Sequence, residues 1–141
     1  MWYSYLIKKI LLKEIQMKIA VTYDEDSEEV FQHFGRTPAF RIYDVQDKKV
    51  KASGIIPSGE YSHGELAGFL KDLGVDVLIC GGLGMGAKTR IEEAGIKLFG
   101  GVTGKADDAV GAYLNGTLDF DPLAAEHHGT SWNGNDVIQT N

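Results

Sequence analysis

The sequence predicts an α/β domain in which a mixed β-sheet of about five strands lies between helices. Three observations indicate this class. The 141 residues are enough for one domain with a sizeable core. Hydrophobic residues at 43% and charged residues at 24% are ordinary for a globular protein. In the second half of the chain, short apolar runs alternate with segments of helical periodicity, and this order is typical of helices packed on a sheet.

The first half of the domain is predicted to be rich in β-structure. Residues 17–23, MKIAVTY, form a short apolar run that predicts a buried first strand. Residues 39–56 hold two strand-like runs on either side of the polar QDKK, which predicts a β-hairpin. The sheet therefore begins with a strand and an adjoining hairpin.

The second half is predicted to alternate helices and strands. In residues 62–74, apolar positions recur at helical spacing, Ser62 and Glu65 form a capping box, and Gly74 ends the helix. The continuous apolar run VDVLICGG predicts a strand covered on both faces. The remaining predicted elements are a helix over 85–94, a short strand over 96–101 and a helix over 105–116.

The two ends of the chain are expected to lie outside this domain, which spans residues 17–122. Residues 1–16, MWYSYLIKKILLKEIQ, lack a cleavage site and are too short and too interrupted by lysine to span a bilayer. They are either a surface helix or a misread leader upstream of a natural start at Met17. Residues 123–141 are polar without periodicity, which predicts a flexible tail.

Composition narrows the possible functions. A formal charge of −6 argues against a general nucleic-acid binder, which needs a basic face. The single cysteine, Cys80, excludes an internal disulfide and a zinc site built from several thiolates. A reducing, cytoplasmic setting fits this cysteine usage.

A glycine-rich stretch, CGGLGMGAKTR, follows the predicted buried strand and opens a helix. Backbone N–H groups attract anions at such a position. The stretch satisfies neither the P-loop motif, because Ala87 separates Gly86 from Lys88, nor the dinucleotide fingerprint. Two interpretations remain open: an anion site, with Lys88 and Arg90 as complementary charges, or close packing of helix on sheet.

Several stretches occur in an order that resembles one known family. They are MKIAV, HFGRTPAFRIYDV, HGEL, DVLICGGLGMGA, EAGIKLF and AVGAYLNGTL. Over about residues 17–120 the chain resembles the dinitrogenase iron-molybdenum cofactor-binding family, the nitrogenase accessory domains of NifX and NifB type. The resemblance implies a ribonuclease H-like three-layer α/β/α fold, binding of a molybdenum-iron-sulfur cluster or its precursor, and no hydrolytic activity. Members often carry a cysteine- or histidine-rich tail, which here is reduced to His127 and His128.

One cysteine cannot supply the four thiolates that build an iron-sulfur cluster, so a preformed cluster would be carried rather than assembled. In the stretch FQHFGRTPAF, His33 is the candidate ligand of the cluster, and Arg36 would balance its negative charge. Gly35 would allow the cluster to approach the backbone closely, and Phe34 would form an apolar wall that excludes water. The other candidates for cofactor binding are Gly81, Gly82, Gly84, Gly86 and Lys88, and those for metal ligation are Cys80, His127 and His128.

Each ligand candidate also has a structural interpretation. His33 could be a partly buried histidine in a turn that completes the core, and Cys80 an inert small hydrophobe. His63 could serve only the first turn of its helix. The carrier hypothesis requires that the stretch around His33 and the glycine-rich stretch meet at one end of the sheet and leave a cationic hollow.

The sequence therefore predicts a non-catalytic carrier of iron-molybdenum cofactor or a related iron-sulfur cluster. Its partners would be that cofactor and a donor or recipient protein, with no nucleic acid and no membrane. One alternative is a regulatory or partner-binding module of the same fold that no longer binds a cluster. Another is a nuclease in which Asp24 and Asp44, on neighbouring strands, bind Mg²⁺.

Overall fold

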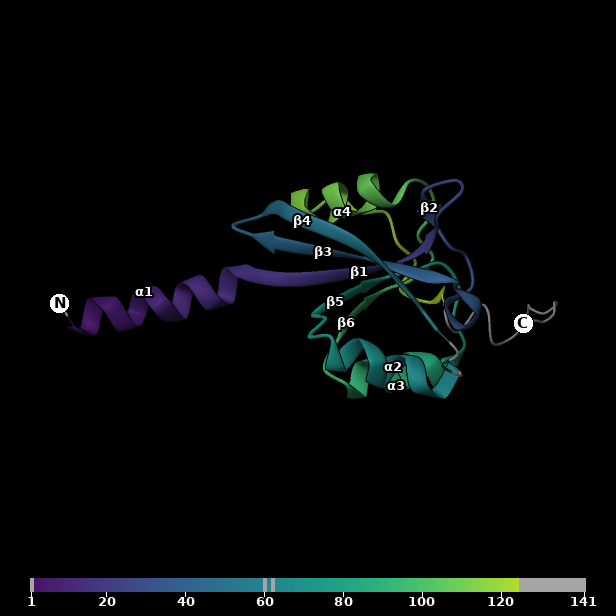
Figure 1. The fold of residues 1–141 in the computed structure, drawn as a ribbon, viewed down its shortest axis with the longest axis horizontal. Coiled ribbons are helices and arrows are strands. Elements are labelled where there is room, and N and C mark those ends of the chain that lie inside the picture. The colour runs from purple at the N-terminus through teal and green to yellow at the C-terminus, as the bar shows by residue number, and fades with distance from the viewer. Residues whose placement is uncertain (1, 60, 62, 125–141) are drawn as a thin grey trace.

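The computed structural model of the protein describes residues 2–59, 61 and 63–124. It has three layers, with helix α4 (Ala106–Asn115) on one face of a mixed sheet and helices α2 (His63–Asp72) and α3 (Met85–Glu93) on the other (Figure 1). This arrangement confirms the predicted α/β/α fold.

Within the described part of the chain the sheet has six strands, in the order β4-β3-β1-β5-β6, with β2 paired to β1. Strand β1 pairs antiparallel with β3 and parallel with β5. The strands are β1 (Gln16–Asp24), β2 (Glu29–Val30), β3 (Ala39–Gln46), β4 (Lys49–Pro57), β5 (Val77–Ile79) and β6 (Lys97–Phe99). Among the described strands, sequence analysis missed β2, because two residues beside an acidic loop carry no periodicity.

Alternation of side chains along the strands builds one core on each face of the sheet. Leu78 of β5 packs in the cluster under α2 and α3, whereas its neighbours Val77 and Ile79 pack in the cluster under α4. All three are buried. The prediction that this apolar run is covered on both faces is therefore confirmed.

Glycines end two of the helices as predicted. Helix α2 is followed by Gly74, whose φ is 81° and whose N–H donates to the carbonyl of Lys71 at 2.9 Å. Helix α4 ends at Gly116, with φ 77°. Both angles lie in the left-handed region that glycine adopts without a steric penalty. Ser62 of the predicted capping box lies outside the described residues.

Helix α1 (Trp2–Ile15) runs directly into β1 and extends away from the domain (Figure 1). Its first aromatic side chains are exposed, with Trp2 at 72% and Tyr3 at 69%. No helix among the described residues is long and apolar enough to cross a membrane. Whether Met17 is the natural start stays a prediction.

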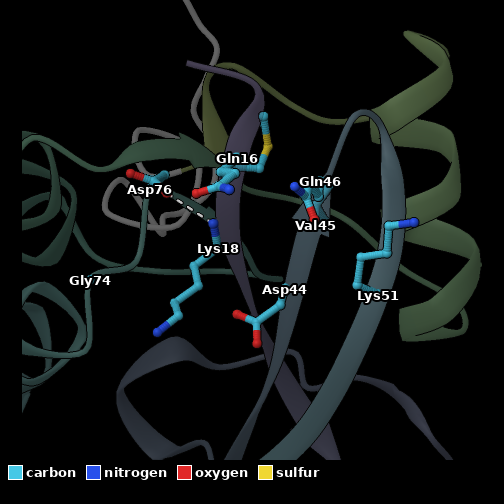
Figure 2. Close-up of a pocket in the computed structure, with 9 residues that line it drawn as sticks. Gln16, Lys18, Asp44, Val45, Gln46, Lys51, Gly74 and Asp76 are labelled. Carbon is cyan, nitrogen blue, oxygen red and sulfur yellow. Dashed lines mark hydrogen bonds between the residues drawn. The ribbon is translucent and has the colours of Figure 1, made fainter. Parts of the chain in front are cut away.

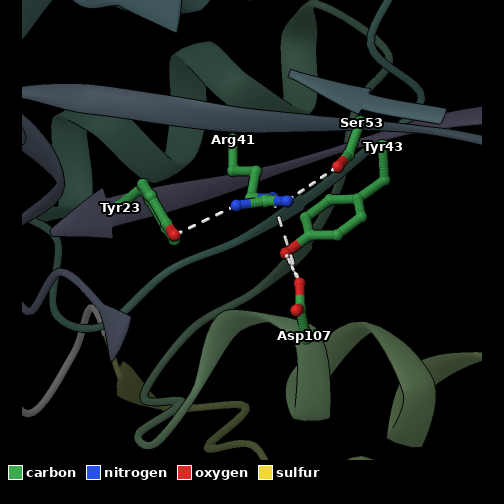
Figure 3. A network of polar contacts seen from close by, with 5 residues as sticks. All are labelled: Tyr23, Arg41, Tyr43, Ser53 and Asp107. Atoms are coloured by element: carbon green, nitrogen blue, oxygen red, sulfur yellow. Dashed lines mark hydrogen bonds and ion pairs between the residues drawn. The ribbon is translucent and has the colours of Figure 1, made fainter. Parts of the chain in front are cut away.

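A polar network joins the sheet to α4 (Figure 3). The hydroxyl of the buried Tyr43 donates to Asp107 Oδ1 at 2.6 Å. Arg41 donates from Nη1 to the Tyr23 hydroxyl at 3.1 Å and from Nη2 to Ser53 Oγ at 2.9 Å. Burial, and then the hydrogen bond to Asp107, raise the pKa of Tyr43. The network holds together four elements, β1, β3, β4 and α4.

Candidate functional site: a pocket between two turns

Two segments far apart in sequence meet beside the carboxyl ends of β1 and β5. We call residues 32–36 the imidazole turn and residues 81–86 the glycine turn. Gly82 N–H donates to the carbonyl of Gln32 at 2.7 Å, and Phe34 N–H donates to the carbonyl of Gly82 at 2.9 Å. His33 and Gly82 thus form a parallel β-bridge. The two turns are hydrogen-bonded neighbours at one end of the sheet.

Gly81 permits this meeting. A Cβ atom at position 81 would lie 2.6 Å from Gln32 Cα and 2.8 Å from Gln32 O, distances that a backbone contact cannot accommodate. Gly81 is buried and is not among the described lining residues of the pocket. It therefore serves the close packing of the two turns, which corrects its assignment as a cofactor-binding residue.

A pocket of about 490 Å³ lies between the two turns and helix α3. The imidazole turn contributes His33, Phe34, Gly35 and Arg36 to its lining. Phe34 is 1% exposed and packs against Phe40 with ring centroids 6.2 Å apart, so it forms a wall anchored in the core. The other described lining residues are Gly82, Leu83, Gly84, Gly86, Ala87 and Arg90.

The start of α3 supplies hydrogen-bond donors to this pocket. Gly84 is the N-cap residue and makes no side-chain capping bond, and Gly86 and Ala87 of the first turn also line the pocket. The first N–H groups of a helix have no partner within the helix, and the helix dipole places partial positive charge there. This end of α3 favours an anion.

The described lining is cationic although the whole chain carries a formal charge of −6. It includes the guanidinium groups of Arg36 and Arg90 and the imidazole of His33, and no carboxylate. Arg36, Arg90 and His33 are all exposed residues.

Lys88 does not lie in this pocket, which corrects its assignment there. It lines a neighbouring pocket of about 160 Å³ together with Glu92 and Asp121. In an α-helix successive residues turn by about 100°, so position 88 is about 200° around α3 from Gly86, whereas position 90 returns to the same side. Sequence reasoning named Arg90 and Lys88 together as charges that could complement an anion, and it did not separate the two. The four-residue spacing from Gly86 to Arg90 was the signal that could have placed it in the pocket.

Cys80 is also absent from the pocket lining. Its side chain is 0% exposed within the apolar cluster beneath α2 and α3. Burial raises the pKa of the Cys80 thiol to about 12, and a metal ligand must be a thiolate. The assignment of Cys80 as a metal ligand is therefore corrected to that of a core residue.

None of the remaining histidine candidates is among the described lining residues of the pocket. His63 is the first residue of α2, and His127 and His128 lie outside the described residues. Among residues 2–59, 61 and 63–124 there is no group of three or more His, Cys, Asp or Glu side chains able to hold a metal ion. The described donors fit a cluster that arrives with its own bridging ligands, and they do not fit the assembly of one from free ions.

The Asp24–Asp44 pair that the nuclease alternative requires is not formed. Asp44 of β3 pairs with Lys18 near the start of β1, whereas Asp24 ends that strand, six positions later and about 20 Å away at ~3.3 Å per residue. Asp24 Oδ1 instead accepts from the N–H of Asp26 at 2.9 Å. Asp44 lines a separate pocket of about 420 Å³ with Lys18 and Asp76 (Figure 2).

Comparison with known proteins gives the family. The model of the family described as "Dinitrogenase iron-molybdenum cofactor" matches residues 16–116. The chain belongs to this family, which confirms the resemblance found in the sequence.

Three relatives cover most of the chain. The uncharacterized protein MJ0580 of Methanocaldococcus jannaschii is 27% identical over 114 residues, which are 77% of this chain and 95% of that protein. The crystal structure of PH0822 is 30% identical and covers 75% of this chain and 96% of its own, with a TM-score of 0.70. The apo form of the orange protein from Desulfovibrio gigas is 28% identical, with 75% and 93% coverage and a TM-score of 0.65.

Proposed function

We propose that the protein is a non-catalytic carrier that binds preformed iron-molybdenum cofactor, or a related metal-sulfur cluster, in the pocket between the imidazole turn and the glycine turn. The observation that carries this proposal is the convergence of His33, Arg36 and the open start of α3 on one pocket in a member of this family.

The chemistry of a preformed cluster suits these residues. Sulfide already fills most of the iron valences, so a single imidazole suffices as a protein ligand. His33 would supply that imidazole from the exposed side of its turn. Arg36 and the donors at the start of α3 would hold the negative charge of the cluster, because charge-assisted hydrogen bonds are the strongest available to a protein. Phe34 would shield one side from water.

The carrier role extends to partners and location. A carried cluster must come from a donor protein and pass to a recipient, so we propose transient contacts with both. Release requires a weak attachment, and a single imidazole with ionic contacts gives a weaker attachment than four thiolates. We place the protein in the cytoplasm, where reducing conditions preserve both the cluster and the single thiol.

Binding of the isolated cofactor tests the proposal. We expect wild-type protein incubated anaerobically with isolated iron-molybdenum cofactor to elute from gel filtration with visible absorbance and with bound molybdenum and iron. His33→Ala should reduce the retained metal at least tenfold, because it removes the proposed ligand. Lys51→Ala, at the other end of the sheet, is the matched surface control and should bind like the wild type.

Rescue separates loss of the ligand from loss of the fold. Imidazole added to His33→Ala should restore part of the absorbance, since the small molecule can occupy the vacated position. If wild-type protein retains no cofactor, the carrier proposal is wrong. The better assignment is then a regulatory module of the same fold. The single imidazole among the described lining residues would be consistent with a domain that does not bind a cluster.

A further inference from the structure

We infer that Arg90 is the second cation of the site, and that Arg36 and Arg90 together select an anionic ligand by its charge. The inference deepens the proposed function, on which it rests, by naming the chemical class of the ligand: a compact inorganic anion with several negatively charged oxygen or sulfur atoms. We call these two residues the guanidinium pair.

The fold brings Arg90 to the pocket through the geometry of α3. Side chains of a helix tilt toward its N-terminus, so a long side chain at position 90 reaches back over position 86. Position 86 is glycine, and a Cβ atom there would lie 3.4 Å from Arg90 Nη1. The guanidinium therefore lies against the first turn of α3, beside the pocket.

Gly64 of α2 borders the same guanidinium. A Cβ atom at position 64 would lie 3.8 Å from both Arg90 Cζ and Arg90 Nε. Arg90 thus occupies a slot between the beginnings of two helices, and no side chain at position 64 or 86 competes for the space. This placement is specific, because a guanidinium directed elsewhere on α3 would not contact both glycines.

The position is electrostatically unfavourable without an anion. The first turn of α3, which holds no acidic residue, carries partial positive charge, and a cation beside a helix N-terminus is repelled by it. Arg36, the other cation of the guanidinium pair, lines the same pocket. Within the described part of the chain, neither guanidinium has a hydrogen-bond or ion-pair partner. An anion bound between them would offset all of these charges at once.

Guanidinium recognition also limits the ligand class. Arginine presents N–H donors in a planar fork that matches two acceptor atoms of one anion. The described pocket offers one imidazole against two such forks and the first-turn N–H groups. Charge and acceptor atoms on the outside of the ligand therefore select what binds, together with the single coordination bond proposed for His33.

The test compares two charge removals on one helix. Arg90→Gln removes the pocket cation, whereas Lys88→Gln removes an equal charge from the side of α3 that faces the neighbouring pocket. With isolated iron-molybdenum cofactor, we expect Arg90→Gln to raise Kd about tenfold and to flatten its dependence on salt, and Lys88→Gln to change neither. Arg90→Lys should fall between, because it keeps the charge and loses the fork. Equal Kd values and equal salt dependence for the two Gln variants would overturn the inference.

A second experiment, the shift of Tm by sodium molybdate, tests the anion site without the cofactor and so distinguishes this inference from the proposed function. Sodium molybdate should raise the Tm of the wild type and of Lys88→Gln, and raise that of Arg90→Gln markedly less. If the cofactor does not bind but this pattern holds, the carrier proposal fails and the anion site stands. If the cofactor does not bind and molybdate shifts all three proteins equally, both are wrong. Circular dichroism of each variant confirms that it is folded.

Discussion

At the scale of single residues, Cys80 shows how burial decides chemistry. A thiol at the end of a strand beside a glycine-rich turn is a reasonable ligand by position. In the structure it is fully buried among apolar side chains, and burial raises its pKa to about 12. A group that stays protonated and inaccessible cannot ligate a metal in the folded protein.

Alkylation measures this burial directly, because Cys80 is the only cysteine in the chain. We expect iodoacetamide at pH 8 to leave the native protein unmodified and to label it fully in urea, as read by mass spectrometry. Equal labelling rates in both conditions would contradict the burial of the thiol.

The same pKa predicts how stability depends on pH. The unfolded thiol ionises near its ordinary pKa of about 8.5, whereas the folded thiol holds its proton to about 12. Its contribution to the free energy of unfolding is therefore complete below about pH 8.5 and is lost as the pH rises toward 12. Urea unfolding across this range should show a steeper loss for the wild type than for Cys80→Ala, which has no ionisable group there.

At the scale of elements, the attachment of α4 to the sheet depends on a polar contact as well as on the core. The Tyr43 hydroxyl crosses from β3 to Asp107 in the first turn of α4 (Figure 3). The carboxylate also lies 3.9 Å from Arg41 Nε and, as an acid in the first turn, is favoured by the helix dipole. The Asp107 side chain thus links α4 to strand β3 of the sheet.

Tyr43→Phe tests this contact and keeps the ring in place. We expect the free energy of unfolding to fall by about 1 kcal/mol, the usual net contribution of one hydrogen bond. Tyr113→Phe in α4 is the matched control. Its ring packs on Phe99, and its hydroxyl has no hydrogen-bond partner among the described residues. Urea denaturation would contradict the prediction if both variants lost the same stability.

At the scale of the whole molecule, the pocket and helix α1 lie at opposite ends of the sheet. Helix α1 leads directly into β1 (Figure 1), whereas the pocket is lined by the imidazole turn and the glycine turn, which follow the carboxyl ends of β1 and β5. The described side chains of α1, residues 2–8, are all exposed. These side chains therefore add little to the core.

A variant that starts at Met17 should keep both the fold and the ligand. It retains every strand pair of β1 except the pair between Gln16 and Gln46. We expect its Tm to lie within a few degrees of that of the full chain and its cofactor affinity to be unchanged. A collapse of the Tm measured by circular dichroism would show that α1 is required by the domain.

Most elements of the fold were predictable because they have a local signal. Apolar runs of period two or without interruption predicted the strands, and Gly74 and Gly116 marked helix ends where positive φ is required. Strand β2 had no such signal, because two residues are too few to show a period. The family could also be recognised from the sequence, because its short motifs occur in a fixed order along the chain.

The sequence by itself determined the layered fold, the family and the candidate role of His33 and Arg36. Only the tertiary structure decided which charges share a pocket. It placed Arg90 in the pocket and Lys88 outside it, buried Cys80 and separated Asp24 from Asp44. The reason is physical: local patterns depend on neighbours along the chain, whereas a site depends on which faces of distant elements point toward the same space.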